Sequence, residues 1–414
     1  MAPTDRPTHG EEEEDSEEYL QDDDVYAEID QGDEPMDEDE DVGGLGDEII
    51  WEDNSIRHFA GHEGPVYAVA AHPTAPVAAS GGGDDFGYIW DVTDGETIVK
   101  LTGHADSVTA TAFSSDGEMV STGGMDGRVR VWRRVGTDDF KTWEFLTELQ
   151  GPDEVMWLRW HPKGPVLLAG SNDSTVWLWQ LPSGNTMQVF AGHTGPVQCG
   201  DFTPDGKRIV TACGDNTLIY WDPRSPTPLF KLTGQDARFD LGGITSLAVN
   251  PASTVAVVGG ANGGVRVVGL SKGEVISALG GHAEEQSVEA IVFVNIVGAV
   301  DGSSAPAAPV GAGTVVTGAT DGKVCIWDLN TNRLRTTLEH KDAVTSLLVH
   351  PTKPHLVISS SADHTLRTWD ARAGHLVREH KGHQELINGA ALGRNGEIVV
   401  SAGDDGACLV FDTE

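Results

Sequence analysis

Short runs of alternating apolar and polar residues recur along this chain from about residue 56 to its end. Examples are SVTATAF (107–113), GRVRVW (127–132) and TLIYW (217–221), which are punctuated by Gly, Asn and Asp. A period of two places one face of a β-strand in a core, and the punctuating residues favour tight turns. We find no stretch with the period of an amphipathic helix. The pattern therefore predicts an all-β protein made of many short strands.

An internal repeat orders these strands. A Gly-His dipeptide, or a variant of it, recurs and is followed, usually about 28 residues later, by Trp-Asp or a relative. The eight copies run from Gly61-His62 to Trp90-Asp91, Gly103-His104 to Trp132-Arg133, Gly151-Pro152 to Trp179-Gln180, Gly192-His193 to Trp221-Asp222, Gly234-Gln235 to Val268-Gly269, Gly281-His282 to Trp327-Asp328, Glu339-His340 to Trp369-Asp370 and Gly382-His383 to Phe411-Asp412. They resemble the WD40 repeat family, whose members are β-propellers of four-stranded blades, so the resemblance implies eight blades.

The two ends of the repeat region suggest how the ring closes. In this family each repeat supplies the outer strand of one blade and the three inner strands of the next, and here the chain stops two residues after Phe411-Asp412. The last blade then lacks an outer strand, and SIRHF (55–59) stands where that strand is needed. We expect an eight-bladed propeller over residues 54–414, closed by this N-terminal strand. The sixth copy carries a Gly, Ala, Ser and Pro-rich surplus at 297–313, which predicts a flexible loop.

The first 53 residues are of a different kind. They contain 24 Asp or Glu and a single basic residue, Arg6, and include the stretch EEEEDSEEYLQDDD (11–24). Such a segment cannot bury enough apolar surface to offset its ordering entropy, so residues 1–53 are predicted to be a disordered acidic tail. Two interpretations stay open: a solubilising segment, or a charged lure for a cationic partner.

The charge of the whole chain limits its partners. The remaining residues are also acidic, so nucleic acid and anionic membranes are expected to be repelled and basic proteins attracted. No apolar run long enough to span a membrane and no signal peptide is seen, which predicts a cytoplasmic protein, with the nucleus as a second compartment. Cys199, Cys213, Cys325 and Cys408 lack metal-ligand spacing and are expected to be reduced core thiols. No metal or cofactor site is predicted, and a closed propeller is expected to be a monomer.

Six repeats contain a His, a hydroxyl and an Asp, the residue types of a catalytic triad. An enzyme needs one such site, so six copies argue against catalysis. The family resemblance implies a structural network instead, in which Asp orients His, His bonds the hydroxyl and the hydroxyl bonds the Trp indole. The sets are His62, Ser80, Asp84, Trp90; His104, Thr122, Asp126, Trp132; His193, Thr211, Asp215, Trp221; His282, Thr317, Asp321, Trp327; His340, Ser359, Asp363, Trp369; and His383, Ser401, Asp405.

Two repeats lack the full network. The third has Pro152 and Ala169 at the His and hydroxyl positions, and the fifth has Gln235 and Val258 there. These two blades are expected to depart from the common pattern. Because the residue types of a triad recur in six repeats, the protein is predicted not to be an enzyme.

Propellers of this type usually bind partners on the face where the loops leading into the innermost strands meet the loops before the structural Asp. The side chains expected there are mostly acidic, with three apolar or aromatic ones, and this combination suits Lys and Arg. They are Glu63, Tyr67, Asp85, Asp106, Asp153, Glu154, Met156, Trp157, Glu284, Glu285, Glu289, Asp342, Glu385 and Asp404. For Trp157 a second interpretation is a residue that packs between blades.

A closer resemblance narrows the function. The acidic N-terminus, GGGDDFGYIWDVTDGE (81–96), WLRWHPKGPVLLAGSNDSTVWLWQLPSGN (157–185) and TPDGKR (203–208) are similar to the family of the angio-associated migratory cell protein. Its fungal members are the dedicated chaperone of a large-subunit ribosomal protein, called L10 in eukaryotes and L16 universally. The resemblance implies a non-enzymatic escort that captures the basic N-terminal segment of this nascent client on the acidic face, for assembly of the 60S subunit.

Two other functions are compatible with the sequence. WDPR (221–224) and WDAR (369–372) match the Trp-Asp-x-Arg pattern of substrate receptors of cullin-type ubiquitin ligases. Escort of histones or of basic proteins in general would also use an acidic face. An adaptor and a general escort are therefore the alternatives to a dedicated ribosomal-protein chaperone.

Overall fold

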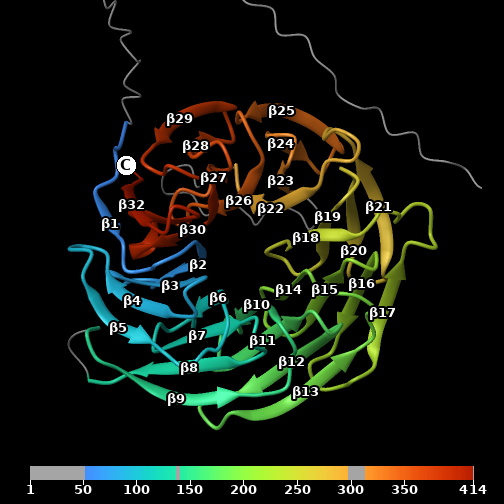
Figure 1. The fold of residues 1–414 in the computed structure, drawn as a ribbon. Helices are drawn as coiled ribbons and strands as arrows, with labels where there is room; N and C mark the ends of the chain where they lie inside the picture. The colour runs from blue at the N-terminus through green and yellow to red at the C-terminus, as the bar shows by residue number, and fades with distance from the viewer. Residues whose placement is uncertain (1–51, 137–139, 297–312, 414) are drawn as a thin grey trace, which may run out of the picture. The chain divides into compact units, whose positions relative to one another are not determined.

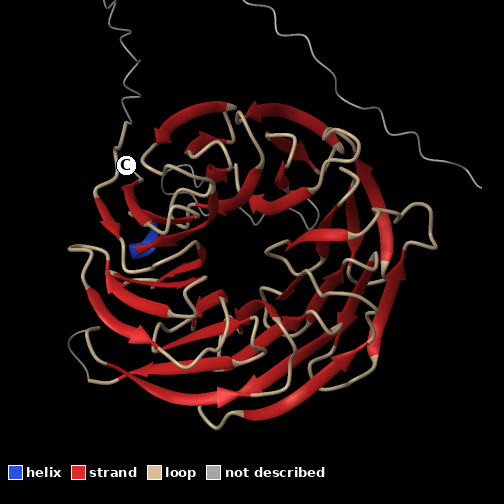
Figure 2. Ribbon diagram, in the orientation of Figure 1, coloured by secondary structure: helices blue, strands red, loops and turns tan. Residues whose placement is uncertain are grey.

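The structure, a computed structural model, describes residues 52–136, 140–296 and 313–413. Within these residues 32 strands form eight four-stranded antiparallel sheets, arranged as blades around one axis (Figure 1). Figure 2 shows that strands and loops make up this part of the chain apart from one 3-10 turn, Arg394–Gly396. No helix among the described residues is long and apolar enough to cross a membrane. The predicted disordered tail (1–53) and flexible loop (297–313) lie almost wholly outside the described residues.

Each blade uses its strands in the same order from the axis outward. The innermost strands are β2 (Val66–Ala71), β6 (Val108–Phe113), β10 (Val155–Trp160), β14 (Cys199–Phe202), β18 (Ile244–Val249), β22 (Val288–Val294), β26 (Val344–Val349) and β30 (Ile387–Gly393). The second strands are β3 (Val77–Gly82), β7 (Met119–Gly124), β11 (Val166–Ser171), β15 (Ile209–Cys213), β19 (Val255–Gly260), β23 (Thr314–Ala319), β27 (Leu356–Ser361) and β31 (Ile398–Gly403).

The third strands are β4 (Gly87–Asp91), β8 (Val129–Arg134), β12 (Thr175–Gln180), β16 (Thr217–Trp221), β20 (Val265–Gly269), β24 (Lys323–Asp328), β28 (Leu366–Asp370) and β32 (Cys408–Asp412). The outer strands are β5 (Thr97–Leu101), β9 (Trp143–Leu149), β13 (Asn185–Ala191), β17 (Pro228–Thr233), β21 (Glu274–Leu279), β25 (Arg333–Glu339), β29 (His375–His380) and, in the last blade, β1 (Arg57–Phe59). We number the blades 1 to 8 in the order of their innermost strands.

The ring closes as the sequence predicts. β1 pairs antiparallel with β32, with Arg57 opposite Val410 and Phe59 opposite Cys408, so the N-terminal strand completes blade 8. Phe59 is buried, and its ring stacks on Trp90 of blade 1 with centroids 4.9 Å apart. One short strand therefore links the last blade to the first and leaves the third strand of blade 8 without a free edge.

A further set of hydrogen bonds ties this closing segment to blade 7. Asn54 Nδ2 donates to Glu379 O at 2.9 Å, and Lys381 N donates to Asn54 Oδ1 at 3.0 Å. Asn54 N also donates to Lys381 O at 3.0 Å, and Lys381 Nζ lies 2.7 Å from Glu52 Oε2. The described chain thus begins beside the end of β29, on the side of the ring where the outer strands end.

The core lies between the blades, because each second and third strand is covered on both faces by its neighbours. β3, β7, β15, β23, β27 and β31 are buried along their whole length, which explains their continuous runs of small and apolar residues. The blades approach closely: a Cβ added at Gly81 of β3 would lie 2.4 Å from Val108 Cγ1 in blade 2. Glycine is required there because no side chain fits between the two blades.

A buried histidine of this core makes stability depend on pH. His380 on β29 is inaccessible to solvent, with Nε2 3.0 Å from Thr368 Oγ1 and its ring against Phe411. Burial and then the positive charge of Arg378 lower the pKa of His380 from 6.5 to about 4. The unfolded chain takes up this proton below pH 6.5 while the folded chain does not, so the contribution is complete above pH 6.5 and is lost as pH falls towards 4.

From that shift we expect His380 alone to remove about 3 kcal/mol of unfolding free energy between pH 6.5 and 4. The variant His380→Phe should lose correspondingly less stability over this range in urea unfolding. His375→Phe, an exposed position on the same strand, is the control. Equal pH dependence in the wild-type and His380→Phe proteins would contradict the prediction.

Candidate functional site

The expected hydrogen-bond network is present in five of the six repeats that carry its His, hydroxyl and Asp. In these five, His Nδ1 lies 2.9–3.2 Å from the Asp carboxylate and Nε2 lies 2.6–2.8 Å from the Ser or Thr hydroxyl. Burial lowers the pKa of His62, His104 and His282, so these rings are neutral near pH 7. The hydroxyls lie in the core, out of reach of a substrate, and the network is structural rather than catalytic.

The last step of the network, from hydroxyl to indole, varies. Trp221, Trp327 and Trp369 donate Nε1–H to the hydroxyl of their own repeat at 2.9, 2.9 and 2.7 Å. Trp90 does not: its Nε1 has no hydrogen-bond partner within the described ranges. The stacked ring of Phe59 covers Trp90, and the predicted bond from Trp90 to Ser80 is wrong.

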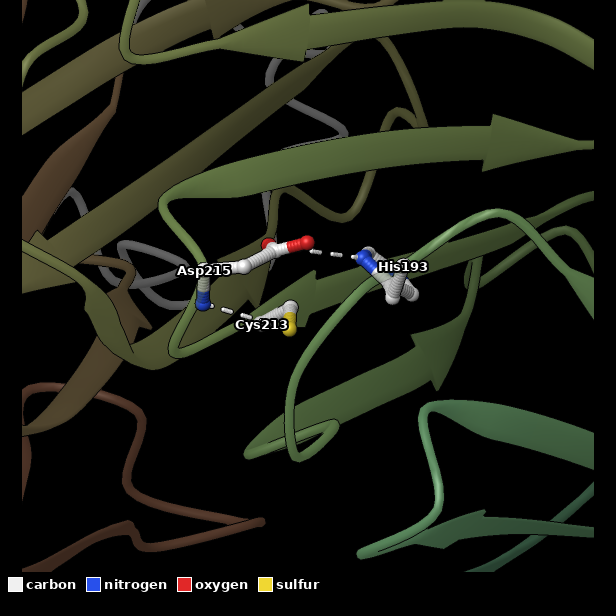
Figure 3. A group of neighbouring side chains, drawn as sticks. All are labelled: His193, Cys213 and Asp215. Carbon is white, nitrogen blue, oxygen red and sulfur yellow. Dashed lines mark hydrogen bonds and ion pairs between the residues drawn. The ribbon is translucent and has the colours of Figure 1, made fainter. Parts of the chain in front are cut away.

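Blade 4 contains a longer relay. His193 Nδ1 is 3.9 Å from Asp215 Oδ1, and Thr217 Oγ1 lies between them, 2.6 Å from the ring and 2.5 Å from the carboxylate. Cys213 lies beside this relay and accepts a hydrogen bond from Asp215 N at 3.3 Å (Figure 3). The sequence did not reveal this arrangement, because Thr217 is outside the residues of the common pattern.

His193, Cys213 and Asp215 each offer a metal-ligand atom, and these atoms lie within 4.8 Å of one another. However, both ring nitrogens of His193 are engaged, Nδ1 with Thr217 and Nε2 with Thr211 at 2.7 Å. Burial also raises the pKa of Cys213 to about 11, whereas a metal needs the thiolate. The hydrogen bonds account for this group of side chains without a cation.

Blade 5 has an apolar replacement for the network. A Cβ added at Gly260 would lie 2.5 Å from Leu241 Cβ, just as one at Gly82 of blade 1 would lie 2.6 Å from His62 Nδ1. Leu241 therefore occupies the place of the histidine and packs with the apolar cluster that includes Val258 and Val268. The alignment of Gln235 with the histidine is wrong, because the loop before β18 is longer than in the other repeats.

The predicted binding residues gather on one face, in the loops before the innermost strands, in the loops between second and third strands, and at the starts of the innermost strands. Nine are exposed: Glu63, Tyr67, Asp106, Asp153, Glu284, Glu285, Glu289, Asp342 and Glu385. Four are half-buried: Asp85, Glu154, Met156 and Asp404. These thirteen residues form the acidic rim. In the same loops the described cations are Arg128, Arg238, Lys341 and Lys381. Arg128 pairs with Asp126 and Glu148, Arg238 with Asp236, and Lys381 with Glu52.

Trp157 does not belong to this surface. It is 6% exposed, and its Nε1 donates to Val197 O of blade 4 at 2.8 Å. Its ring fills the space above Gly170 and Gly200, where an added Cβ would lie 2.3 and 2.5 Å from ring atoms. The prediction that Trp157 binds a partner is wrong, and the interpretation as a residue that packs between blades is correct.

The second residue of an innermost strand has one of two roles. In some blades its side chain bonds to the next blade, and in others it makes no hydrogen bond. Thr109, Thr245 and Thr345 donate to the first carbonyl of the next blade at 2.8, 2.7 and 2.6 Å, and Asn388 donates to Val66 O at 2.9 Å. These bonds link neighbouring blades around the axis.

Three other side chains have no hydrogen bond or ion pair within the described ranges, and all three are exposed. They are Tyr67 and Glu289, at this same position, and Gln198, at the corresponding place before β14. By contrast, Glu154 accepts a bond from Asn172 Nδ2 at 3.0 Å and Asp404 accepts one from Asn388 Nδ2 at 2.7 Å. Tyr67, Gln198 and Glu289 are therefore the inner positions free to contact a ligand.

Comparisons with known proteins agree with this architecture. The family "WD domain, G-beta repeat" matches residues 53–91, 95–133, 143–180, 184–222, 332–370 and 374–412. The stretch between residues 222 and 332 is not matched, and it holds the fifth repeat, with Leu241, and the sixth, with its surplus residues 297–313. The human angio-associated migratory cell protein is 32% identical over 373 residues, which are 87% of this chain and 80% of the human protein.

Two fungal relatives extend the comparison. The ribosome assembly protein SQT1 of Saccharomyces cerevisiae is 26% identical over 94% of this chain and 93% of its own length. A crystal structure of Chaetomium thermophilum Sqt1 bound to the N-terminus of the ribosomal protein L10 superposes with a TM-score of 0.79, at 30% identity, over 87% of this chain and 100% of the other. This chain therefore belongs to the WD40 propeller family, and within it to the group that contains the angio-associated migratory cell protein and Sqt1.

Proposed function

We propose that this protein is a dedicated, non-enzymatic chaperone of ribosomal protein L10, which holds the basic N-terminal segment of that client on the acidic rim and escorts it through the cytoplasm for assembly of the large ribosomal subunit. The observation that carries the proposal is the similarity to a Sqt1 structure bound to the N-terminus of L10, combined with a face on which carboxylates greatly outnumber cations.

The rim has the chemistry that such a client needs. A single exposed ion pair contributes only about 0 to 1 kcal/mol, but many carboxylates on one face attract and orient a cationic peptide together. Glu289 is exposed and unpaired within the described ranges, so it requires no rearrangement to accept Lys or Arg. The exposed ring of Tyr67 adds a surface for cation-π contact.

Binding of a synthetic L10 N-terminal peptide, measured by calorimetry or fluorescence anisotropy, tests the proposal. A histone-tail peptide of equal length and charge is the comparison. A dedicated chaperone binds the L10 peptide at least tenfold more tightly than the histone peptide. Equal affinities would indicate a general escort of basic proteins, and failure to bind the L10 peptide would reject the proposed client.

The acidic N-terminal segment is expected to speed capture. This segment is attached to the propeller through Glu52, which lies beside Lys381 in a loop of the rim face. The Debye length is about 8 Å at physiological salt, so charge carried on such a tether acts beyond the reach of fixed carboxylates. Deletion of residues 1–47 should lower the association rate constant for the L10 peptide about three- to tenfold and leave the dissociation rate constant nearly unchanged in stopped-flow experiments. An unchanged association rate would show that the segment only aids solubility.

A further inference from the structure

Two large apolar side chains lie exposed on the rim face of the described structure, Tyr67 at 39% and Met125 at 45%. The other exposed large apolar residues lie on the outer strands, at the closing segment or in the loop after β8: Phe145, Met187, Leu229, Ile276, Leu334, Leu376, Val377, Ile56 and Val135. Met125 was not among the residues predicted for the site, because only charged side chains were expected to bind a client next to the structural Asp. The rim thus contains apolar surface that charge alone does not explain.

The loop geometry places Met125 on this face. It follows β7 and immediately precedes the network residue Asp126, and its N–H donates to Ser107 O, in the loop before β6, at 2.9 Å. The residues at the same position of the other blades are small or polar: Gly83, Asn172, Gly214, Ala261, Thr320, Ala362 and Asp404. Met125 is therefore a single large apolar side chain in a ring of small and polar ones.

Two further apolar side chains lie on the rim of the adjoining blades 1 and 3. Tyr67 lies at the start of β2 in blade 1, and the half-buried Met156 lies at the start of β10 in blade 3. The innermost strands of these blades lie side by side, β2 next to β6 and β6 next to β10, and Thr109 bonds to Val155 O. Carboxylates surround the three side chains in the adjoining loops: Glu63, Asp106, Asp153 and Glu154. On blades 4 and 5 the corresponding rim positions, Gln198, Gly214 and Ala261, are neither acidic nor large and apolar.

We propose that Tyr67, Met125 and Met156 form an apolar docking patch that takes a large apolar or aromatic side chain of the client, between the cationic side chains that the surrounding carboxylates bind. Charge complementarity decides which partner occupies the patch. The carboxylates around it favour a basic segment with at least one large apolar residue over an apolar helix or a second copy of this acidic chain. This inference rests on the proposed function and adds a second criterion for the client.

The carboxylates and the apolar patch contribute to binding in two different ways, through charge attraction and through apolar burial. Salt screens the attraction between carboxylates and cations but has little effect on apolar burial. Methionine adapts its shape to irregular apolar partners, so Met125 can accommodate an incoming side chain without a preformed cavity. A client that offers charge alone, such as a Lys-rich tail, would meet the carboxylates but leave the patch empty.

The test uses the full chain and two peptides: the L10 N-terminal segment and the same segment with every large apolar residue replaced by Ser. Met125→Ser is compared with Met187→Ser, which removes a methionine of similar exposure, 48%, from the outer strand β13. We expect Met125→Ser to weaken the unmodified peptide about five- to tenfold at both 0.15 and 0.5 M salt. Met187→Ser should change nothing, and the Ser-substituted peptide should bind the wild-type and Met125→Ser proteins equally.

Two results would overturn the proposal. One is an unchanged affinity of Met125→Ser for the unmodified peptide. The other is an equal loss with both peptides, which would show that Met125 shapes the rim without contacting an apolar side chain. Failure of the wild-type chain to bind the L10 peptide at all is a different outcome, because it rejects the proposed client and the patch together.

Discussion

Deletion of the last ten residues, 405–414, is expected to leave a chain that has no cooperative thermal transition. The deletion removes β32, which pairs with β31 on one side and with β1 on the other. Cys408, Val410 and Phe411 of this strand are fully buried, and the cut also removes Asp405 from its hydrogen bond with His383. β1 is left without a partner, so the cover that Phe59 gives to Trp90 is lost as well.

The expected loss exceeds what a domain can tolerate. Truncating one large buried side chain costs about 2–5 kcal/mol, and a folded domain is stable by only about 5–15 kcal/mol. Circular dichroism and calorimetry should show a broad, non-cooperative change for the truncated chain. Deletion of residues 1–47, which spares Glu52 and every strand, is the control and should keep the wild-type Tm. A C-terminal truncation with the wild-type Tm would mean that the ring does not depend on its closing strand.

The fold could be predicted from the sequence because the pattern that specifies each blade is local and is repeated along the chain. Each copy places apolar residues at a period of two and turn residues between them, and each blade is buried against its neighbours, so the same pattern recurs in every repeat. Closure was predictable for a similar reason. The last blade lacked an outer strand in the repeat pattern, and SIRHF (55–59) stood where it was needed; this segment forms β1, over Arg57–Phe59.

Other parts of the site could not be derived from periodicity. The alternation along β10 does not show that Trp157 has room between blades, because that room is provided by Gly170 on β11 and Gly200 on β14. Nor does spacing reveal that Leu241 replaces a histidine, since the loop before β18 changes the register of the repeat. Apolar groups of similar volume often replace a buried polar network at little cost, so a repeat can lose the residue types of the network and still keep its packing.

The double charge reversal Glu154→Lys with Glu289→Lys is expected to weaken binding of the L10 N-terminal peptide by more than about a hundredfold. These carboxylates lie on blades 3 and 6, so a client that crosses the axis meets an unfavourable charge on both sides. Placing like charges together costs several kcal/mol, more than the loss of two attractive contacts. Because Glu154 also bonds Asn172, the Tm of the variant must be shown to match that of the wild type.

The matched control is Glu96→Lys with Glu274→Lys, which makes the same change in net charge at exposed positions where outer strands begin, away from the rim. If the rim binds the client, this control keeps most of the wild-type affinity while the rim variant loses it. Equal losses in the two variants would show that only the net charge of the chain attracts the peptide, because a repulsion that acts through total charge does not depend on where the lysines are placed. Full affinity in the rim variant would place the client on a different surface of the propeller.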